Sequence, residues 1–142
     1  MATTLSDNKN SVRVSLQKQY RDLPLSFLKH PGTNDVRPLN DLDAVKQSVK
    51  NLILTNYGER PFNPRVGSNV THYLFEPVSP FTASELERNI QRTLREQEPR
   101  INGVFVRVFD NSDENAYVIQ LQYNVVSLNI QAESSFLLRR LR

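Results

Sequence analysis

The stretch TLREQEPRINGVFVRVFD, residues 93–110, contains the boundary between a helix and a sheet. Its first half continues a charged helical pattern, which ends at the triplet Glu98-Pro99-Arg100. Proline disfavours helical backbone at the residue before it, so we expect the helix to stop at Glu98. Directly afterwards, residues 103–109 place valine at every second position, which predicts a β-strand.

The helix that ends at this junction is predicted to begin near residue 82. Thr82 and Glu85 form a T-x-x-E pattern, so we expect a capping box at this helix start. A large aliphatic residue then recurs every four positions, at Leu86, Ile90 and Leu94. Because charged residues occupy the opposite face, the pattern predicts an amphipathic helix.

Another amphipathic helix is predicted earlier in the chain. Asn40 or Asp41 can cap its start, it extends to about Asn56, and Gly58 is a natural C-terminal stop. Its single apolar face carries Leu42, Val45, Val49, Leu52 and Ile53.

Further strands follow the junction. Residues 116–127 alternate apolar and polar side chains, and residues 134–142 are a candidate third strand. A hairpin-like segment at 24–39 and a short helical turn at 70–75 are also indicated. We therefore predict an α+β domain over 20–142, with two main helices packed on a small antiparallel sheet and extended N- and C-terminal arms. Residues 1–19 are expected to be a flexible arm.

The composition restricts the class of protein. The 142 residues have a net charge of +3 and no cysteine, which excludes disulfides and thiolate sites. No apolar run is long enough to span a bilayer, and we expect no secretory signal and no membrane association. Basic residues are concentrated only in the terminal LLRRLR, without the aromatics of a nucleic-acid surface, so no nucleic-acid partner is predicted.

Catalytic chemistry has little support in the sequence. Glu76 and Glu98 are the only acids that we would nominate, because both precede a proline. His30 and His72 are far apart and lack a neighbouring carboxylate cluster, which makes a poor metal site. We predict no catalytic residue, no metal and no cofactor.

The triplet is better explained by recognition or by structure. The dipole at a helix C-terminus disfavours a negative charge, so we expect Glu98 to be paired with Arg100, with Arg60 or with an arginine of a partner. The planar guanidinium of Arg100 suits carboxylates and carbonyl oxygens. A docking contact and an internal salt bridge are equally compatible with these residues.

Two motifs, read together, resemble a known family. Gly58-Glu59-Arg60-Pro61-Phe62 and Glu98-Pro99-Arg100 occur here in the order and at the separation found in the small baseplate wedge proteins of contractile-tailed phages. That family also includes a baseplate component of type VI secretion systems and is sometimes labelled "lysozyme-like". The similarity covers roughly residues 20–142.

The resemblance implies a structural role in a virion tail baseplate that is assembled in the host cytoplasm. Family members are expected to look like a reduced tail-sheath subunit and to form a ring of six. Their implied partners are the helical core bundle of other baseplate wedge proteins, the tail sheath protein, and tail tube or hub proteins. The implied function is to dock on the wedge core and to template the first sheath ring by strand exchange.

The resemblance assigns docking to Glu98, Pro99 and Arg100. Arg60, Pro61 and Phe62 are expected to form a supporting loop, in which Phe62 anchors to the core and Arg60 pairs either internally or with a partner. For strand exchange we expect the strand at residues 116–127 to belong to a sheet that has an open edge. The segment that pairs beside it is Phe136, Leu137, Leu138, Arg139, Arg140 and Leu141.

Two other functions stay open at this point. A type VI secretion baseplate subunit would differ from a phage protein only in its partners. A peptidoglycan-cleaving, lysozyme-like enzyme would need Glu76 or Glu98 for turnover.

Overall fold

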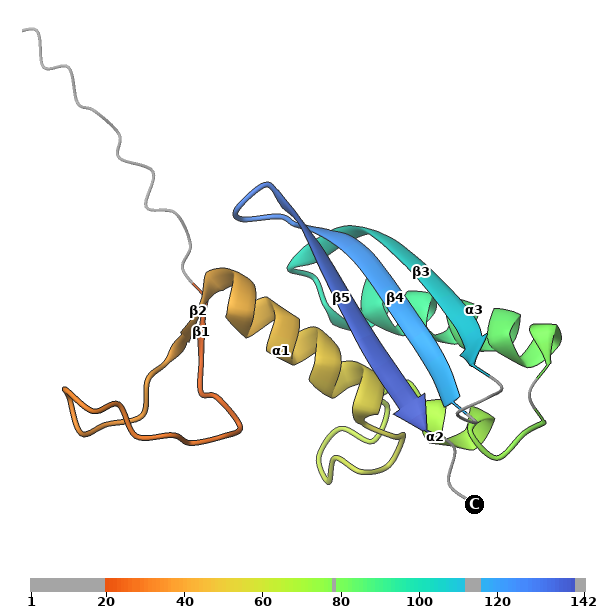
Figure 1. The fold of residues 1–142 in the computed structure, drawn as a ribbon, viewed down its shortest axis with the longest axis horizontal. Coiled ribbons are helices and arrows are strands. Elements are labelled where there is room, and N and C mark those ends of the chain that lie inside the picture. Colours follow the sequence, from red (N-terminus) through yellow and green to blue (C-terminus); the bar gives the residue numbers. More distant parts are fainter. Residues whose placement is uncertain (1–19, 78, 112–115, 140–142) are drawn as a thin grey trace, which may run out of the picture.

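The computed structural model describes residues 20–77, 79–111 and 116–139, and Figure 1 shows their arrangement. The elements, in chain order, are β1 (Arg21–Asp22), β2 (Leu39–Asn40), α1 (Asp41–Leu54), α2 (Val70–Tyr73), α3 (Pro80–Gln97), β3 (Ile101–Asn111), β4 (Ala116–Val125) and β5 (Ile130–Arg139). The predicted α+β class is confirmed. The expected arm at 1–19, and Arg140 and Leu141, lie outside the described residues.

Helix α1 packs its apolar face into the core, where Ala44, Val45, Val49 and Ile53 are all buried. Asn40 occupies the position before the helix, but its side chain makes no capping bond. Instead, the Asp41 carboxylate accepts a bond from the backbone N–H of Tyr20 at 3.0 Å. The helix ends at Leu54, before Gly58, because Thr55 takes up extended backbone and its hydroxyl donates to the carbonyl of Asn51 at 2.7 Å.

Helix α3 begins three residues earlier than the capping box predicts. Ser79 is the cap: its hydroxyl oxygen accepts the N–H of Thr82 at 3.1 Å, and Pro80 opens the helix. Thr82 is instead buried in the first turn and donates to the carbonyl of Pro77 at 3.1 Å. The predicted C-terminal end is confirmed, since Glu98 leaves helical geometry with φ −120° and ψ 84°.

The main sheet is antiparallel, with the order β3-β4-β5. In its register, Ile119 of β4 lies between Val108 of β3 and Phe136 of β5. The predicted third strand is confirmed and begins earlier, at Ile130. β4, which holds most of the strand predicted at residues 116–127, is paired on both sides and is the central strand of the sheet. The free edges of the sheet belong to β3 and β5.

The sheet has one covered face and one uncovered face. Side chains that point to the helices are buried: Tyr117, Ile119, Leu121, Tyr123 and Val125 on β4, together with the apolar faces of α1 and α3. The other face carries Phe105, Phe109 and Leu137, each about half exposed. The domain is therefore a two-layer structure (Figure 1).

A hairpin arm precedes α1 and projects from the body of the domain (Figure 1). β1 pairs with β2 at its base, and Lys29 bridges to Val36 near its tip, which confirms the hairpin-like prediction. The apolar side chains of the arm are not in the core: Leu23, Leu25, Phe27 and Leu28 are 56%, 65%, 60% and 73% exposed. No helix in the described part of the chain has the length and hydrophobicity to cross a bilayer.

Candidate partner-docking site

The junction between α3 and β3 is organised around the carboxylate of Glu98. Arg100 donates from Nε to Oε1 at 2.6 Å and from Nη2 to Oε2 at 2.7 Å, which is the bidentate geometry of a guanidinium and a carboxylate. Ser48 of α1 donates its hydroxyl to Oε2 at 2.6 Å. Glu98 thus joins the end of α3, the start of β3 and the middle of α1.

This carboxylate is buried, with only 3% of the residue exposed. Burial alone would raise the pKa of Glu98, but the hydrogen bonds from Arg100 and Ser48 and the charge of Arg100 outweigh burial and lower it. The hydrogen bond to Glu98 is the main reason why the pKa of Arg100 is raised. Both groups are therefore charged at neutral pH, and Glu98 is engaged inside its own domain.

Arg100 also connects the turn to its surroundings. Its carbonyl accepts the N–H of Val126 at 2.9 Å, just beyond the end of β4. Its guanidinium lies over the ring of Tyr20, 5.4 Å from the ring centre. The side chain remains 28% exposed, so Arg100 reaches both the internal carboxylate and the surface.

The loop at residues 57–67 is fixed against this turn by Gln97. Its amide oxygen accepts the N–H of Gly67 at 2.9 Å, and its amide nitrogen donates to the carbonyl of Arg65 at 3.1 Å. Gly67 has φ +132°, and a Cβ at this position would stand 2.4 Å from the carbonyl oxygen of Thr55. Only glycine fits this close approach of two backbones.

A groove of about 720 Å³ lies between the arm, α1, the loop and the turn, and is called the junction groove below. The arm contributes an apolar wall, formed by Leu23, Leu25 and Phe27. The opposite wall is polar and includes Arg60, Asn51 and the triplet 98–100. The lining balances two arginines, Arg60 and Arg100, with two acids, Asp22 and Glu98, and combines apolar with polar surface. Such a surface suits an amphipathic protein segment.

The structure brings Arg60 and the triplet 98–100 together at the junction groove, whereas Pro61 and Phe62 do not line it. Glu98 pairs with Arg100, as one of the open alternatives required, and no bond joins Glu98 to Arg60 within the described residues. Arg60 lines the junction groove, and Pro61 is exposed. Phe62 is 101% exposed at the tip of its loop, so the expectation that it anchors to the core is wrong. The loop is held by backbone bonds and by Gln97, and needs no apolar anchor.

Ser48, Gln97 and Tyr20 were not foreseen as members of this site. Ser48 carries a weak signal, because it is a polar residue beside the predicted apolar face of α1. The contacts of Gln97 and Tyr20 join segments about 30 and 80 residues apart, which no local pattern records.

The proposed strand-exchange segment forms the second half of β5. Phe136 is half-buried, Leu138 is buried, and Leu137 and Arg139 are exposed. Their pairing beside β4 confirms the expected neighbour of that strand.

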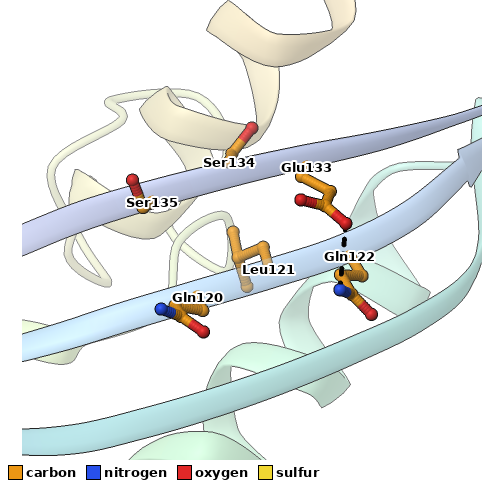
Figure 2. A pocket seen from close by; sticks show the side chains of 6 residues that line it. All are labelled: Gln120, Leu121, Gln122, Glu133, Ser134 and Ser135. Carbon is orange, nitrogen blue, oxygen red and sulfur yellow. Dashed lines mark hydrogen bonds between the residues drawn. The ribbon is translucent and has the colours of Figure 1, made fainter.

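Carboxylates nominated for catalysis are not arranged as a pair. Glu76 lies 3.6 Å from His72 on the surface, while Glu98 is buried and bound to Arg100. A polar hollow of about 300 Å³ lies between β4 and β5 (Figure 2), where Gln122 donates to Glu133 at 3.0 Å. Glu133 is the only acid that lines it. The described residues contain no cluster of three or more potential metal ligands.

Comparison with known proteins gives a consistent result. The sequence profile described as baseplate wedge protein gp25 matches residues 40–133. Baseplate wedge protein gp25 of Enterobacteria phage T4 is 32% identical over 112 residues, which covers 79% of this chain and 84% of the T4 protein.

Solved structures share the fold. A putative tail lysozyme from Geobacter sulfurreducens superposes with a TM-score of 0.63 at 22% identity, over 69% of this chain and 89% of that one. A chain of the type VI secretion baseplate complex gives 0.55 at 18% identity, over 68% and 92%. A chain of the post-contraction baseplate of pyocin R2 gives 0.52 at 25% identity, over 82% and 97%.

Proposed function

The chain belongs to the family of baseplate wedge protein gp25, and from this we propose that it is a structural subunit of a contractile-tail baseplate that docks on the wedge core and starts the tail sheath. The observation that carries the docking half is the junction groove, where the family triplet and the exposed loop line one surface. Six copies would form a ring in the virion, assembled in the host cytoplasm, next to the tail tube and hub.

In this proposal the buried and the exposed residues of the site have different roles in docking. Glu98 holds the guanidinium of Arg100 in place and ties three elements together. The contact with a wedge partner then falls to groups that reach the surface: Arg60, Phe62 and the exposed part of Arg100. A rigid aromatic with its whole surface in water contributes far more to binding than to folding.

Sheath initiation requires a sheet that can accept another strand. Main-chain hydrogen bonds supply affinity in such contacts, and alternating side chains supply register. The sheet described above has three strands and unpaired edges, which supports this part of the proposal.

A peptidoglycan-cleaving activity is not favoured. The relative in phage T4 is described as a baseplate wedge protein, and the similarity to the putative tail lysozyme shows a shared fold only. A general acid needs a raised pKa, whereas the pKa of Glu98 is lowered. A place in a type VI secretion baseplate is the second candidate, and the fold of the secretion baseplate chain favours it.

Docking is tested by capture of the wedge core proteins of the same tail on the immobilised full chain. Arg60→Ala/Phe62→Ala should bind at least about tenfold more weakly, because it removes a cation that lines the groove and an exposed aromatic side chain of the same loop. The melting temperature should not change, since both side chains are exposed.

Arg92→Ala is the matched control, because Arg92 is an exposed arginine of α3 away from the groove. It should bind as the wild type does. Full binding by the folded double variant would mean that the interface lies elsewhere. The triplet would then serve only as an internal salt bridge at the end of α3.

A further inference from the structure

The uncovered face of the three-stranded sheet mixes apolar and charged side chains. Its large apolar members, Phe105, Phe109 and Leu137, are each about half exposed. Because side chains alternate between the two faces of a strand, Arg107 of β3 and Glu133 of β5 belong to this face as well, and both are exposed. The face thus has the composition of a contact surface, with a positive group on one outer strand and a negative group on the other.

The register of the sheet sorts these side chains into rows that cross all three strands. Three successive rows, each with its β4 residue in the middle, are Phe109–Val118–Leu137, Arg107–Gln120–Ser135 and Phe105–Gln122–Glu133. The first row is apolar from one edge of the sheet to the other. In the next two rows, the positive charge lies at the β3 end and the negative charge lies at the β5 end.

Both charged groups are held in place by contacts within the face. The guanidinium of Arg107 lies over the ring of Phe105, 5.3 Å from the ring centre, so it leans out of its own row toward the row of Glu133. Gln122 donates to the carboxylate of Glu133 at 3.0 Å (Figure 2). Among the residues that the structure describes, neither Arg107 nor Glu133 forms an ion pair. Each charge can therefore pair with a group of another molecule.

A second copy of the chain complements this face when the two copies are related by a twofold axis that runs along β4. A twofold axis brings the same patch of both copies together. With this axis, each row meets itself and β3 of each copy lies over β5 of the other. Phe109 then packs on Leu137 of the second copy, and Arg107 meets Glu133 of the second copy. Two apolar contacts and two ion pairs form by symmetry.

The other twofold axis in the plane of the interface, which runs across the strands, does not give this match. It places β3 over β3 and β5 over β5, so Arg107 has only residues of β3 opposite it and Glu133 has only residues of β5. The two charges therefore select the axis along β4. The strands of the two copies then run in nearly the same direction, as in sheets that pack face to face.

The size of the face sets the strength of such a dimer. Neighbouring strands lie about 4.8 Å apart and rise about 3.4 Å per residue, so three strands of about ten residues present on the order of 450 Å². Two copies then cover roughly 900 Å² in total, which is less than the ~1,200–2,000 Å² of a stable specific interface. The expected dimer is therefore weak and depends on the protein concentration.

We propose that the uncovered face of the sheet is a homodimer interface, with Arg107 of each copy paired to Glu133 of the other and the apolar rows in contact. The inference does not rest on the proposed function, because the complementary groups all belong to this chain. A twofold pair is not a unit of the proposed ring of six. The dimer is thus a state of the free chain, before assembly.

Sedimentation velocity of the full chain over a wide range of concentrations tests the proposal. The wild type should change from monomer to dimer as the concentration rises. Arg107→Glu alone and Glu133→Arg alone should each dimerise at least about tenfold more weakly, because each variant brings two pairs of like charges together. Thermal melts show whether the variants are folded, which we expect because both side chains are exposed.

A mixture of the two variants gives the sharper result. When Arg107→Glu meets Glu133→Arg, both pairs across the interface again have opposite charges. An equimolar mixture should therefore dimerise about as well as the wild type, although neither variant does so alone. A folding defect in either variant cannot produce this recovery.

Lys50→Glu is the matched control for the change in net charge. Lys46 and Lys50 belong to α1, in the helix layer, and line a cleft beside the outer edge of β5. Lys50 is exposed, and its reversal changes the net charge by as much as Arg107→Glu does. Lys50→Glu should dimerise as the wild type does. A dimer that responds to Lys50→Glu and not to Arg107→Glu would overturn the face-to-face contact.

Three further outcomes would also overturn the proposal: a wild type that stays monomeric at every concentration, a dimer that survives in both single variants, or a mixture of the variants that stays monomeric. A monomeric wild type whose capture of a wedge core protein is lost in Arg107→Glu would assign the face to that protein instead. Failure of the proposed function is seen separately, as a wild type that captures no wedge core protein.

Discussion

Both carboxylate oxygens of Glu98 accept hydrogen bonds from the guanidinium of Arg100, at 2.6 and 2.7 Å, two residues along the chain. The proline between them stops α3 and holds the two side chains on one side of the turn. The triplet 98–100 is thus first an internal salt bridge at the end of a helix. The surface that it presents to a partner depends on that salt bridge.

Arg100→Ala is expected to lower the free energy of unfolding by about 3 kcal/mol, because it leaves the buried carboxylate of Glu98 with Ser48 as its remaining side-chain donor. Urea unfolding at pH 7 measures this change. The exposed pair Arg88–Glu85 is the comparison, since its side chains are 76% and 37% exposed, and Arg88→Ala should cost less than about 0.5 kcal/mol. Equal losses of unfolding free energy in Arg100→Ala and Arg88→Ala would contradict the structural role of the Glu98–Arg100 salt bridge.

The free energy of unfolding should depend on pH through the titration of Glu98. Its pKa in the folded protein lies below the ordinary value of 4.5, so the unfolded chain binds more protons in this range. The contribution of Glu98 is fully present above pH 4.5 and is lost as the pH falls through the folded pKa. The free energies of unfolding of the wild type and of Glu98→Gln, measured from pH 7 to pH 3, should converge as the pH falls. A difference in unfolding free energy between the two proteins that stays the same at every pH would exclude this effect of Glu98 protonation.

Gly67→Ala should be strongly destabilising, by about 3 kcal/mol or more, because the new Cβ would meet the carbonyl oxygen of Thr55 at 2.4 Å. Gly58→Ala is the matched control: Gly58 also has a positive φ, +85°, but nothing lies within 4 Å of a Cβ there. It should cost only about 1 kcal/mol. Thermal melts of both variants separate backbone strain from the clash, and similar melting temperatures would argue against the close approach.

Ser79→Ala should cost about 1 kcal/mol, because it removes the acceptor for the N–H of Thr82 at the start of α3. Glu85→Ala should change stability by less than about 0.5 kcal/mol, since the capping box that would use Glu85 does not form. Chemical denaturation of the two variants decides between the two helix starts. A larger loss for Glu85→Ala would restore the capping box.

Periodicity predicted the elements well because each depends on neighbours in the chain. The valines of β3, the four-residue repeat of α3 and the stop at Pro99 are local signals, and both elements and the boundary between them form as predicted. The start of α3 was placed wrongly because two candidate caps, Ser79 and Thr82, stand three residues apart, and the proline at position 80 selects the first.

The site was predictable only in part, since it is built from distant segments. The pairing of Glu98 with Arg100 follows from their proximity in the chain, whereas the bond to Ser48 spans 50 residues. The burial of Phe62 was predicted wrongly, because an aromatic side chain in a proline-rich loop suggests a contact with the core. The loop is instead held by Gln97 and by backbone hydrogen bonds. Which strands lie at the edges of the sheet could not be predicted, because strand order is a property of the whole fold.

On the outer edge of β3, two side chains of α3 occupy backbone groups: Gln91 donates to the carbonyl of Val104, and Glu87 accepts the N–H of Val108. This favours β5 as the edge through which copies of the chain would meet. Two copies that joined through β5 would be related by a twofold axis. Their helix layers would then lie on the same side, and Lys46 and Lys50 of each copy would confront the same lysines of the other. Like charges disfavour that pairing, so Lys46 and Lys50 oppose self-association of the chain through β5.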